Sequence, residues 1–223
     1  MRLEKASNEA IKFSCINYHY SKSVPVNPVA FSVFNSKNEF CGCILYGYGA
    51  ANNIAKAFGF VQGNVIELTR MALNGKQEST SKSLAISLKL IKKLCPLVKL
   101  IVSYADSEQS HIGIIYQATN WYFIGQSIDT NLIINNKRMH RRSIGSVYGT
   151  SSLVKLKSMG HDVTAIKTKI KYKYIYPLNK ELTELCEKLK KPYPKKSVIS
   201  IVSDTITNPS EEGGVEPTIT HHE

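Results

Sequence analysis

The sequence predicts an α/β (α+β) fold in which helices flank a mixed central sheet. The main observation is the order of its segments, which reads strand, strand, strand, helix, strand, helix, strand from the spacing of apolar residues. A second observation is size, because 223 residues with 43% hydrophobic content suit one globular domain with an appendage. This interleaved order argues against a β-sandwich or a helical bundle.

The first part of the chain predicts one helix and three strands. Residues Asn8–Cys15 indicate a short helix that stops before NYHYSKSVPVNP, a loop rich in turn residues. Val29–Phe34 and Phe40–Tyr48 indicate a hairpin across the polar turn NSKN. Val65–Leu73 indicates a third strand, whose alternation places on opposite faces the sets Glu67, Thr69, Met71 and Ile66, Leu68, Arg70.

The second part adds helices and three further strands. Thr80–Leu94 carries apolar residues at helical spacing, has lysines outside and meets Pro96 as a stop, so we expect a helix. The segment KIKYKYIYPL alternates basic and aromatic residues, which is typical of a strand. The remaining elements are expected as a strand at Leu97–Tyr104, a helix at Ser110–Thr119, strands at Trp121–Gly125 and Tyr172–Pro177, and a helix at Lys180–Lys190.

We expect a folded domain over residues 1–191 and an acidic, disordered tail over residues 192–223. From Pro192 onward the chain is rich in Pro, Ser, Thr and Glu, a composition typical of disorder. No window reaches about 18 consecutive apolar residues, and the first residues lack the apolar segment of a secretory signal. These absences predict an intracellular protein.

The five cysteines are odd in number and lie mostly inside apolar segments, so we expect no disulfide framework. Cys41 and Cys43 are spaced C-x-C on a predicted strand, which points both thiols to one face. The pair could bind a metal, or the two thiols could be buried as small hydrophobic side chains. We favour burial.

The net charge of +12 is unevenly distributed along the chain. Residues 1–191 hold 27 Lys and Arg against 12 Asp and Glu, whereas residues 192–223 hold 2 against 5. Between Thr130 and Lys180 there are eleven basic residues and one acidic residue, Asp162. The concentration of charge predicts a polyanionic partner. An ordinary solvated basic face is the alternative, and a membrane surface is disfavoured because no amphipathic helix accompanies the charge.

Four motifs in order span most of residues 17–178: NYHYSK at Asn17–Lys22, ELTRMAL at Glu67–Leu73, YADSEQSHIGIIYQATNW at Tyr104–Trp121 and KYKYIYPL at Lys171–Leu178. Together they resemble the phage Mom-type DNA adenine modification proteins. The resemblance implies a GNAT-like acyltransferase fold. It also implies an enzyme that places a carbamoylmethyl group on the exocyclic amine of adenine in double-stranded DNA, in the cytoplasm of the bacterial host, and protects that DNA from restriction.

Transfer to this amine needs a proton acceptor, because its lone pair is delocalised into the ring. Asp106 ends a predicted strand and can accept the proton or orient a histidine, and His19 is expected to titrate near neutrality. Tyr20 and Tyr116 can donate to developing charge or stack on a flipped base. The resemblance places all four in the family's proposed active site. The alternatives are a surface histidine, a helix cap at Asp106 and core packing of Tyr116.

The loop NGKQESTSKS before the helix at Thr80 is the candidate site for an acyl-CoA-type donor. Free backbone N–H groups at a helix start favour an anion, although this loop lacks a Gly-x-Gly pattern. Arg70 matches the family's arginine and can pair with a phosphate or carboxylate, or instead with an internal carboxylate. The expected donor contacts are Arg70, Ser79, Thr80, Ser81, Lys82 and Ser83.

The identity of the donor stays open at this stage, because an acetamide-type product is an alkylation outcome that plain acyl transfer does not give. An iron requirement is suggested by the resemblance alone. His19, His111 and Asp106 are the residues that could ligate a metal, but they lack compact ligand spacing.

The acceptor DNA is expected on the late basic segment, where cations alternate with aromatic residues. The expected contacts are Lys137, Arg138, Arg141, Arg142, Lys171 and Lys173, while Trp121 is expected in the core. Two other functions stay open. They are a conventional N-acetyltransferase acting on a protein or small molecule, and a basic nucleic-acid-binding protein without catalysis.

Overall fold

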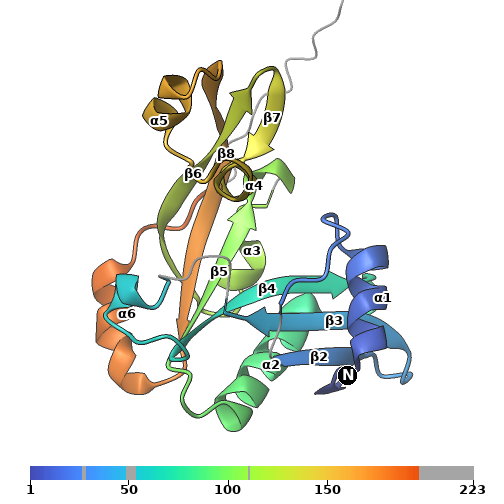
Figure 1. Cartoon of the computed structure of the whole chain (residues 1–223). Coiled ribbons are helices and arrows are strands. Elements are labelled where there is room, and N and C mark those ends of the chain that lie inside the picture. The colour runs from blue at the N-terminus through green and yellow to red at the C-terminus, as the bar shows by residue number, and fades with distance from the viewer. Residues whose placement is uncertain (27–28, 49–53, 110, 196–223) are drawn as a thin grey trace, which may run out of the picture.

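The computed structural model describes residues 1–26, 29–48, 54–109 and 111–195, with the backbone alone at 108, 128–130, 140–142 and 167–169 (Figure 1). Its eight strands form one sheet in the order β1-β2-β3-β4-β5-β8-β6-β7. All neighbouring strands run antiparallel except β4 and β5, which are parallel. The strands are β1 Arg2–Lys5, β2 Val29–Phe34, β3 Phe40–Gly47, β4 Val65–Leu73, β5 Leu100–Asp106, β6 Tyr122–Ile134, β7 Lys137–His140 and β8 Val163–Pro177. The predicted mixed sheet flanked by helices is therefore confirmed.

Helices cover both faces of the first half of the sheet. The helix α1 (Asn8–Tyr18) begins at the N-cap Ser7 and buries Ile11 and Cys15 against Leu45 and Ala72. On the opposite face, α2 (Thr80–Leu94) packs its apolar residues on the strands, among them Leu84, Leu88 and Ile91. The remaining helices are α3 Ile114–Gln117, α4 Arg141–Tyr148, α5 Leu153–Ser158 and α6 Thr183–Leu189, with short 3-10 turns η1 Lys56–Phe58, η2 Ser107–Gln109 and η3 Lys180–Leu182.

The parallel strands β4 and β5 form a fork. They pair from Val65↔Leu100 to Glu67↔Val102 and then diverge, although β4 continues to Leu73 and β5 to Asp106. In Figure 1 the two strands leave their shared start in different directions, with α3 beside the opening. The fork leaves backbone and side chains of both strands available to line a cavity.

A β-bulge at Thr69 changes the faces that β4 presents. Leu45 pairs with Arg70 and Tyr46 pairs with Leu68, so Thr69 is the extra residue, and its hydroxyl donates to the Leu45 carbonyl at 3.1 Å. The alternation predicted from sequence is therefore wrong beyond Leu68. Met71, not Arg70, shares the core face with Leu68, and Arg70 turns toward the α1 side.

A second bulge separates the two cysteines of the C-x-C pair. Val33 pairs with Gly42 and Phe34 with Phe40, which leaves Cys41 unpaired in the ladder. Cys41 lies in the core under α2 and Cys43 in the core under α1, so the expectation that both thiols share a face is wrong. Both side chains are fully buried, as we expected for small hydrophobic residues.

Beyond the fork, the second half of the sheet extends into an arm, which we define as residues 128–170. The strand β5 covers β8 only as far as the pair Asp106↔Lys171, and β6 and β8 continue together to the pair Ile134↔Val163. Figure 1 shows this ribbon projecting from the molecule, with β7 and α5 toward its end and α4 closer to the tip of β5. The sequence did not predict this extension, since it placed only short strands at Trp121–Gly125 and Tyr172–Pro177.

The arm has its own small core. Leu132, Ile134, Ile144, Leu156 and Val163 are buried together beneath α4 and α5. The turn Asn135–Asn136 between β6 and β7 has positive φ at both residues, 47° and 64°, as a tight hairpin requires. This local packing keeps the end of the arm folded although it lies beyond the main sheet.

The short α3 replaces the longer helix predicted at Ser110–Thr119. It starts after Gly113, which has a φ of +84°, and the chain before it forms no helix beyond η2 among the described residues. A Cβ at Gly113 would lie 2.4 Å from Cε2 of Tyr174, so only glycine fits there. Ser110 and residues 196–223 of the predicted tail lie outside the described residues. Among the described residues, no helix is long and apolar enough to cross a membrane.

Candidate active site

A cavity of about 1010 Å³ lies in the fork between β4 and β5. Its wall is built from segments far apart in sequence. These are Tyr18–Tyr20 at the end of α1, Glu67–Met71 of β4, Thr80 and Ser81 of α2, Tyr104–Asp106 of β5, His111–Tyr116 with Ala118, and the facing residues Ser127 and Lys171. All four predicted catalytic residues, His19, Tyr20, Asp106 and Tyr116, therefore meet around one space.

Asp106 and Tyr20 form a pair on this wall. Asp106 is the last residue of β5, and Tyr20 follows α1 by two residues. Burial and the negative charge of Asp106 raise the pKa of Tyr20, so the phenol stays protonated and can donate a hydrogen bond to that carboxylate. Tyr20 is nevertheless 52% exposed, which leaves its ring accessible to a bound molecule.

His19 stacks on Tyr20, with ring centroids 4.3 Å apart. Its Nδ1 accepts the Ser21 backbone N–H at 3.2 Å and lies 2.9 Å from the Ser21 hydroxyl. Because a backbone N–H can only donate, Nδ1 is the acceptor and the proton of the neutral ring is on Nε2.

The expectation that His19 titrates near neutrality is wrong. Burial comes first among the causes, followed by the positive charge of Arg70 and a smaller contribution from His111, and together they lower the pKa of His19 to about 4. At neutral pH the ring is uncharged and presents an N–H donor.

Tyr116 forms the buried end of the cavity. Its hydroxyl oxygen lies 2.8 Å from the Ser103 hydroxyl, and that hydroxyl also donates to the Leu68 carbonyl at 3.1 Å. A serine has one proton to donate, so the Tyr116 hydroxyl completes the network by donating to Ser103. Burial raises the pKa of Tyr116 to about 12. Its ring also packs against Trp121 at 5.1 Å, and Trp121 is fully buried, as expected for a core residue.

Arg70 offers an unused donor at the cavity. Its Nη1 donates to the Thr69 carbonyl at 2.7 Å, while its buried Nε has no hydrogen-bond partner among the described residues. Buried donors are almost always satisfied in folded proteins, so this atom fits an acceptor on a bound molecule.

The predicted donor loop divides into two groups. Thr80 and Ser81 line the cavity, and Ser81 also opens onto a neighbouring pocket of about 340 Å³ that Lys82 lines. Ser79 is instead the N-cap of α2, accepting the Lys82 backbone N–H at 3.1 Å. Ser83 is fully buried and donates to the Ser79 carbonyl at 2.9 Å. The structure thus does not bring Ser79 or Ser83 to the cavity.

The predicted DNA contacts lie in three places. Lys171 lines the cavity opposite Asp106 in the strand register. Lys137 and Arg138 are exposed on β7 of the arm. Lys173 is half-buried, with its ammonium 4.7 Å from the centre of the Phe58 ring, and burial lowers its pKa. The side chains of Arg141 and Arg142, at the start of α4, lie outside the described residues.

Glu67 and Tyr104 are among the cavity residues that were absent from the predicted site. Glu67 and Tyr104 face the fork from β4 and β5, and burial followed by the charge of Glu67 raises the pKa of Tyr104 to about 12. Both belong to the motifs ELTRMAL and YADSEQSHIGIIYQATNW, so the motifs carried the signal. Only the fork geometry, which no pattern reveals, turns them toward one space.

The described residues include no group of three or more His, Cys, Asp or Glu side chains that could hold a metal ion. The iron suggested by the resemblance therefore has no matching ligand set in this part of the chain, and no chemical step is assigned to it.

Comparison with known proteins decides the family. The model of the Mom protein family matches residues 1–195. The chain belongs to the Mom protein family. Among curated proteins, the methylcarbamoylase Mom of Escherichia phage Mu is 31% identical over 185 residues, which cover 79% of this chain and 76% of that protein. The predicted family and the predicted class, a transferase, are confirmed by this match.

Several solved structures that align with this Mom-family chain are acetyltransferases. The spermidine/spermine N-acetyltransferase SpeG from Vibrio cholerae aligns with 82% of this chain and 98% of its own, at 9% identity and a TM-score of 0.44. A GNAT-family acetyltransferase from Bacillus anthracis aligns with 80% and 96%, at 11% identity and a TM-score of 0.43. TM-scores below 0.5 do not establish a common fold, so the family assignment rests on the sequence matches.

Proposed function

We propose that this Mom-family protein transfers a carbamoylmethyl group to the exocyclic amine of adenine in double-stranded DNA. The single observation that carries the proposal is the Tyr20–Asp106 pair beside the neutral His19 on one cavity wall. Family membership with the phage Mu methylcarbamoylase supplies the reaction class. The modification would occur in the cytoplasm of a bacterial host and protect the DNA from restriction.

Asp106 is the proposed proton acceptor. As the amine lone pair forms a bond to the methylene carbon of the donor, the bond from that carbon to the rest of the donor breaks and the leaving group departs with its electron pair. One amine proton must also leave, and the carboxylate at the end of β5 accepts it. The protonated Tyr20 hydroxyl is proposed to hold that carboxylate in position by donating a hydrogen bond to it. This arrangement gives the carboxylate a fixed direction before the amine arrives, which shortens the path of the proton.

His19 is proposed as a hydrogen-bond donor, in place of the general base expected from sequence. Ser21 occupies Nδ1, and the lowered pKa keeps the ring neutral, so Nε2–H is the group that faces a ligand. A neutral N–H donor stabilises negative charge that develops on an oxygen of the donor group during transfer. The exposed Tyr20 ring stacked on His19 also provides a flat surface for the adenine ring.

The donor is proposed to bind on the β4 side of the fork. Thr80 and Ser81 stand at the N-terminus of the 15-residue helix α2, where backbone dipoles favour an anion such as the phosphate of an acyl-CoA-type molecule. The unpartnered Nε–H of Arg70 would donate a hydrogen bond to an oxygen of the same molecule. Such a donor would supply an activated carbon for the amine, and these residues would hold it against the fork.

The acceptor adenine is proposed to enter the cavity flipped out of the duplex. Its amine is engaged in pairing inside a helix, so an enzyme that acts on it must extract the base into a pocket. Lys171, opposite Asp106, is placed to meet a phosphate at the cavity mouth, and we retain Lys137, Arg138, Arg141 and Arg142 as further contacts. Lys173 is not among the proposed DNA contacts, because its ammonium packs on the Phe58 ring.

Mass analysis of nucleosides tests the proposal. DNA from cells that express the chain as soluble protein should contain deoxyadenosine carrying one carbamoylmethyl group in place of a hydrogen. The same DNA should resist several restriction enzymes. Unaltered nucleosides would contradict DNA modification, whereas an acetyl adduct on deoxyadenosine would retain the acceptor and refute the carbamoylmethyl donor.

A further inference from the structure

We propose that the arm, residues 128–170, lies along about eight base pairs of duplex on one side of the target adenine and contacts phosphates through its β7 edge. The inference rests on the proposed function, because it takes the cavity as the place where the adenine binds. It goes further by naming a second DNA surface and the stretch of duplex that this surface covers.

The arm begins at the cavity. Ser127 and Lys171 are partners in the β6–β8 register, and both line the cavity. The next residues of β6 and β8 leave the cover of β5 and run outward together. A duplex whose base enters the cavity must therefore pass the root of the arm.

The arm carries much of the positive charge of the protein. Within residues 128–170 there are eight Lys and Arg and two Asp, so a fifth of the chain holds half of its net charge of +12. A concentration of cations on one projecting element is typical of a surface that meets a polyanion.

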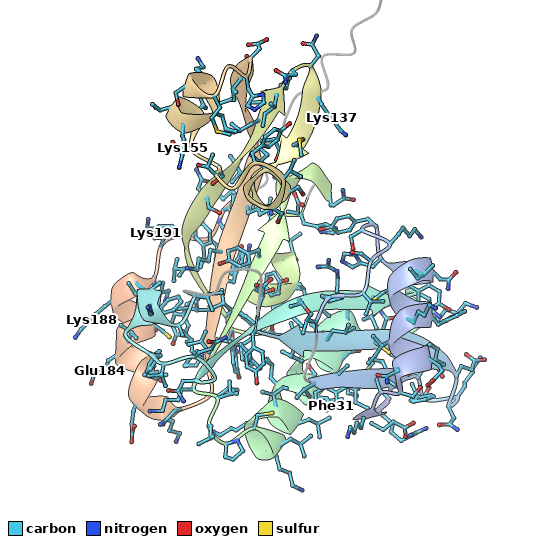
Figure 2. All side chains as sticks on the ribbon, viewed as in Figure 1. Phe31, Lys137, Lys155, Glu184, Lys188 and Lys191 are labelled. Atoms are coloured by element: carbon cyan, nitrogen blue, oxygen red, sulfur yellow. The ribbon has the colours of Figure 1, made fainter. Side chains whose placement is uncertain are left out.

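Two exposed basic residues lie on the β7 edge, on the side of the arm that faces the fork. Lys137 and Arg138 are exposed on β7, directly after the Asn135–Asn136 turn. The Arg138 guanidinium lies 3.3 Å from the Asn131 side chain, whose oxygen can accept from it, so its plane is held on the sheet. In Figure 2, Lys137 lies on the same side of the arm as α1 and the fork, while Lys155 of α5 lies on the other side.

The length of the arm sets the length of duplex that it covers. Val163, at the outer end of β8, lies eight residues from Lys171 at the cavity. At about 3.3 Å per residue this strand spans about 26 Å, which equals about eight base pairs at roughly 3.4 Å each. The Lys137–Arg138 edge pairs with the outer end of β6, so it meets DNA near the far limit of this span.

Salt dependence of binding tests the arm without requiring activity. We compare the full-length protein with the double variant Lys137→Gln/Arg138→Gln on one 30-base-pair duplex by fluorescence anisotropy. Each lost phosphate contact lowers the slope of log affinity against log salt by about 0.9, so the β7 variant should lose about 1.8. The matched control is Lys155→Gln/Lys157→Gln, which removes the same charge from α5, whose Lys155 lies on the other side of the arm, and should leave the slope unchanged.

Flank length tests the covered distance. Duplexes with one target adenine are trimmed from each end in turn, and the modified nucleoside is quantified. Modification should fall when one flank, and not the other, becomes shorter than about eight base pairs. The β7 variant should show no such asymmetry.

The outcomes separate the arm from the function. A lower slope for the β7 variant with no modified nucleoside on any duplex would support the arm and refute the proposed function. Equal slopes for wild type and the β7 variant, or equal losses in both variants, would overturn the arm proposal even if modification occurs. Loss of binding to phosphatidylglycerol vesicles with unchanged DNA binding would overturn it as well, since the arm would then be a membrane surface.

Discussion

Substitution of Gly113 by alanine should distort the wall of the cavity. Gly113 has a φ of +84°, a left-handed conformation that costs an alanine roughly 1–2 kcal/mol. The added Cβ would also lie 2.4 Å from Cε2 and 2.5 Å from Cζ of the Tyr174 ring. Relief of such an overlap in a packed core typically costs about 1–3 kcal/mol, so the free energy of unfolding should fall by about 2–5 kcal/mol in total.

Gly160 provides a matched control. Its φ of +85° is almost the same, but a Cβ there would meet nothing within 4 Å. Gly160→Ala should therefore show only the backbone cost, and the two variants should differ by about 1–3 kcal/mol, which is about 2–12 °C in melting temperature. The comparison isolates the contact with Tyr174 from the cost of the φ angle.

The Gly113 variant should also lose modification activity. The Tyr174 hydroxyl donates to the Ile112 carbonyl, and Ile112 to Tyr116 line the cavity, so a displaced ring moves that wall. We would measure melting temperature by calorimetry and modified nucleoside by mass analysis on both variants. Equal melting temperatures and equal activities would refute the view that the Tyr174 ring packs under Gly113 and positions the wall.

Further predictions concern His19, Arg70 and Tyr20. The folded state keeps His19 neutral down to about pH 4, whereas the unfolded chain takes up a proton near 6.5; the contribution of His19 to stability should be complete above pH 6.5 and fall as pH drops toward 4. Imidazole NMR signals of His19 should thus stay those of an Nε2–H ring from pH 8 to 5, and titration near 6.5 would contradict this. Arg70→Gln should raise the pKa of His19, because the guanidinium charge is the largest cause of the shift after burial, and an unchanged pKa would mean that the two groups do not interact. Tyr20→Phe removes the hydroxyl that donates to Asp106 and should lower modification by about fivefold with little change in DNA affinity, since such a bond contributes about 1 kcal/mol. Full activity would show that the hydroxyl does not position the carboxylate.

Elements with a clear local pattern could be predicted from the sequence. The bounds of β4 and α2 agree with the prediction because strand alternation, apolar helical spacing and the Pro96 stop are all local. The helix α1 runs one turn further than Cys15, and the hairpin of β2 and β3 is found where the polar turn indicated it. Such features depend on residues a few positions apart.

The bulges and the arm depend on contacts that no local pattern encodes. One extra residue at Thr69 reverses the face of Arg70, and an unpaired Cys41 separates two thiols that simple alternation places together. In the arm, the apolar residues are buried only because Leu132, Ile144 and Leu156 pack together from three different elements. These apolar positions stand between basic residues and show too weak a periodicity to predict a strand or a helix. The sequence therefore predicted only a basic segment here.

The candidate site was predicted by motif, and its chemistry was not. His19, Tyr20, Asp106 and Tyr116 meet around the cavity, although more than 80 positions separate Tyr20 from Asp106. The neutral state of His19 depends on burial and on Arg70, which turns toward it only through the bulge. The protonation of a residue is set by its surroundings, so a sequence pattern alone misjudges it.

The most direct test of the account is the Asp106→Asn variant, measured by the fraction of deoxyadenosine that is modified in DNA. The asparagine keeps the shape and can still accept the Tyr20 hydrogen bond, but it cannot accept the amine proton. Modification should fall by ~100-fold or more, the usual size of a general-base contribution, while DNA affinity and melting temperature stay near wild type. Modification at the wild-type level by folded Asp106→Asn protein would contradict the assignment of Asp106 as the proton acceptor.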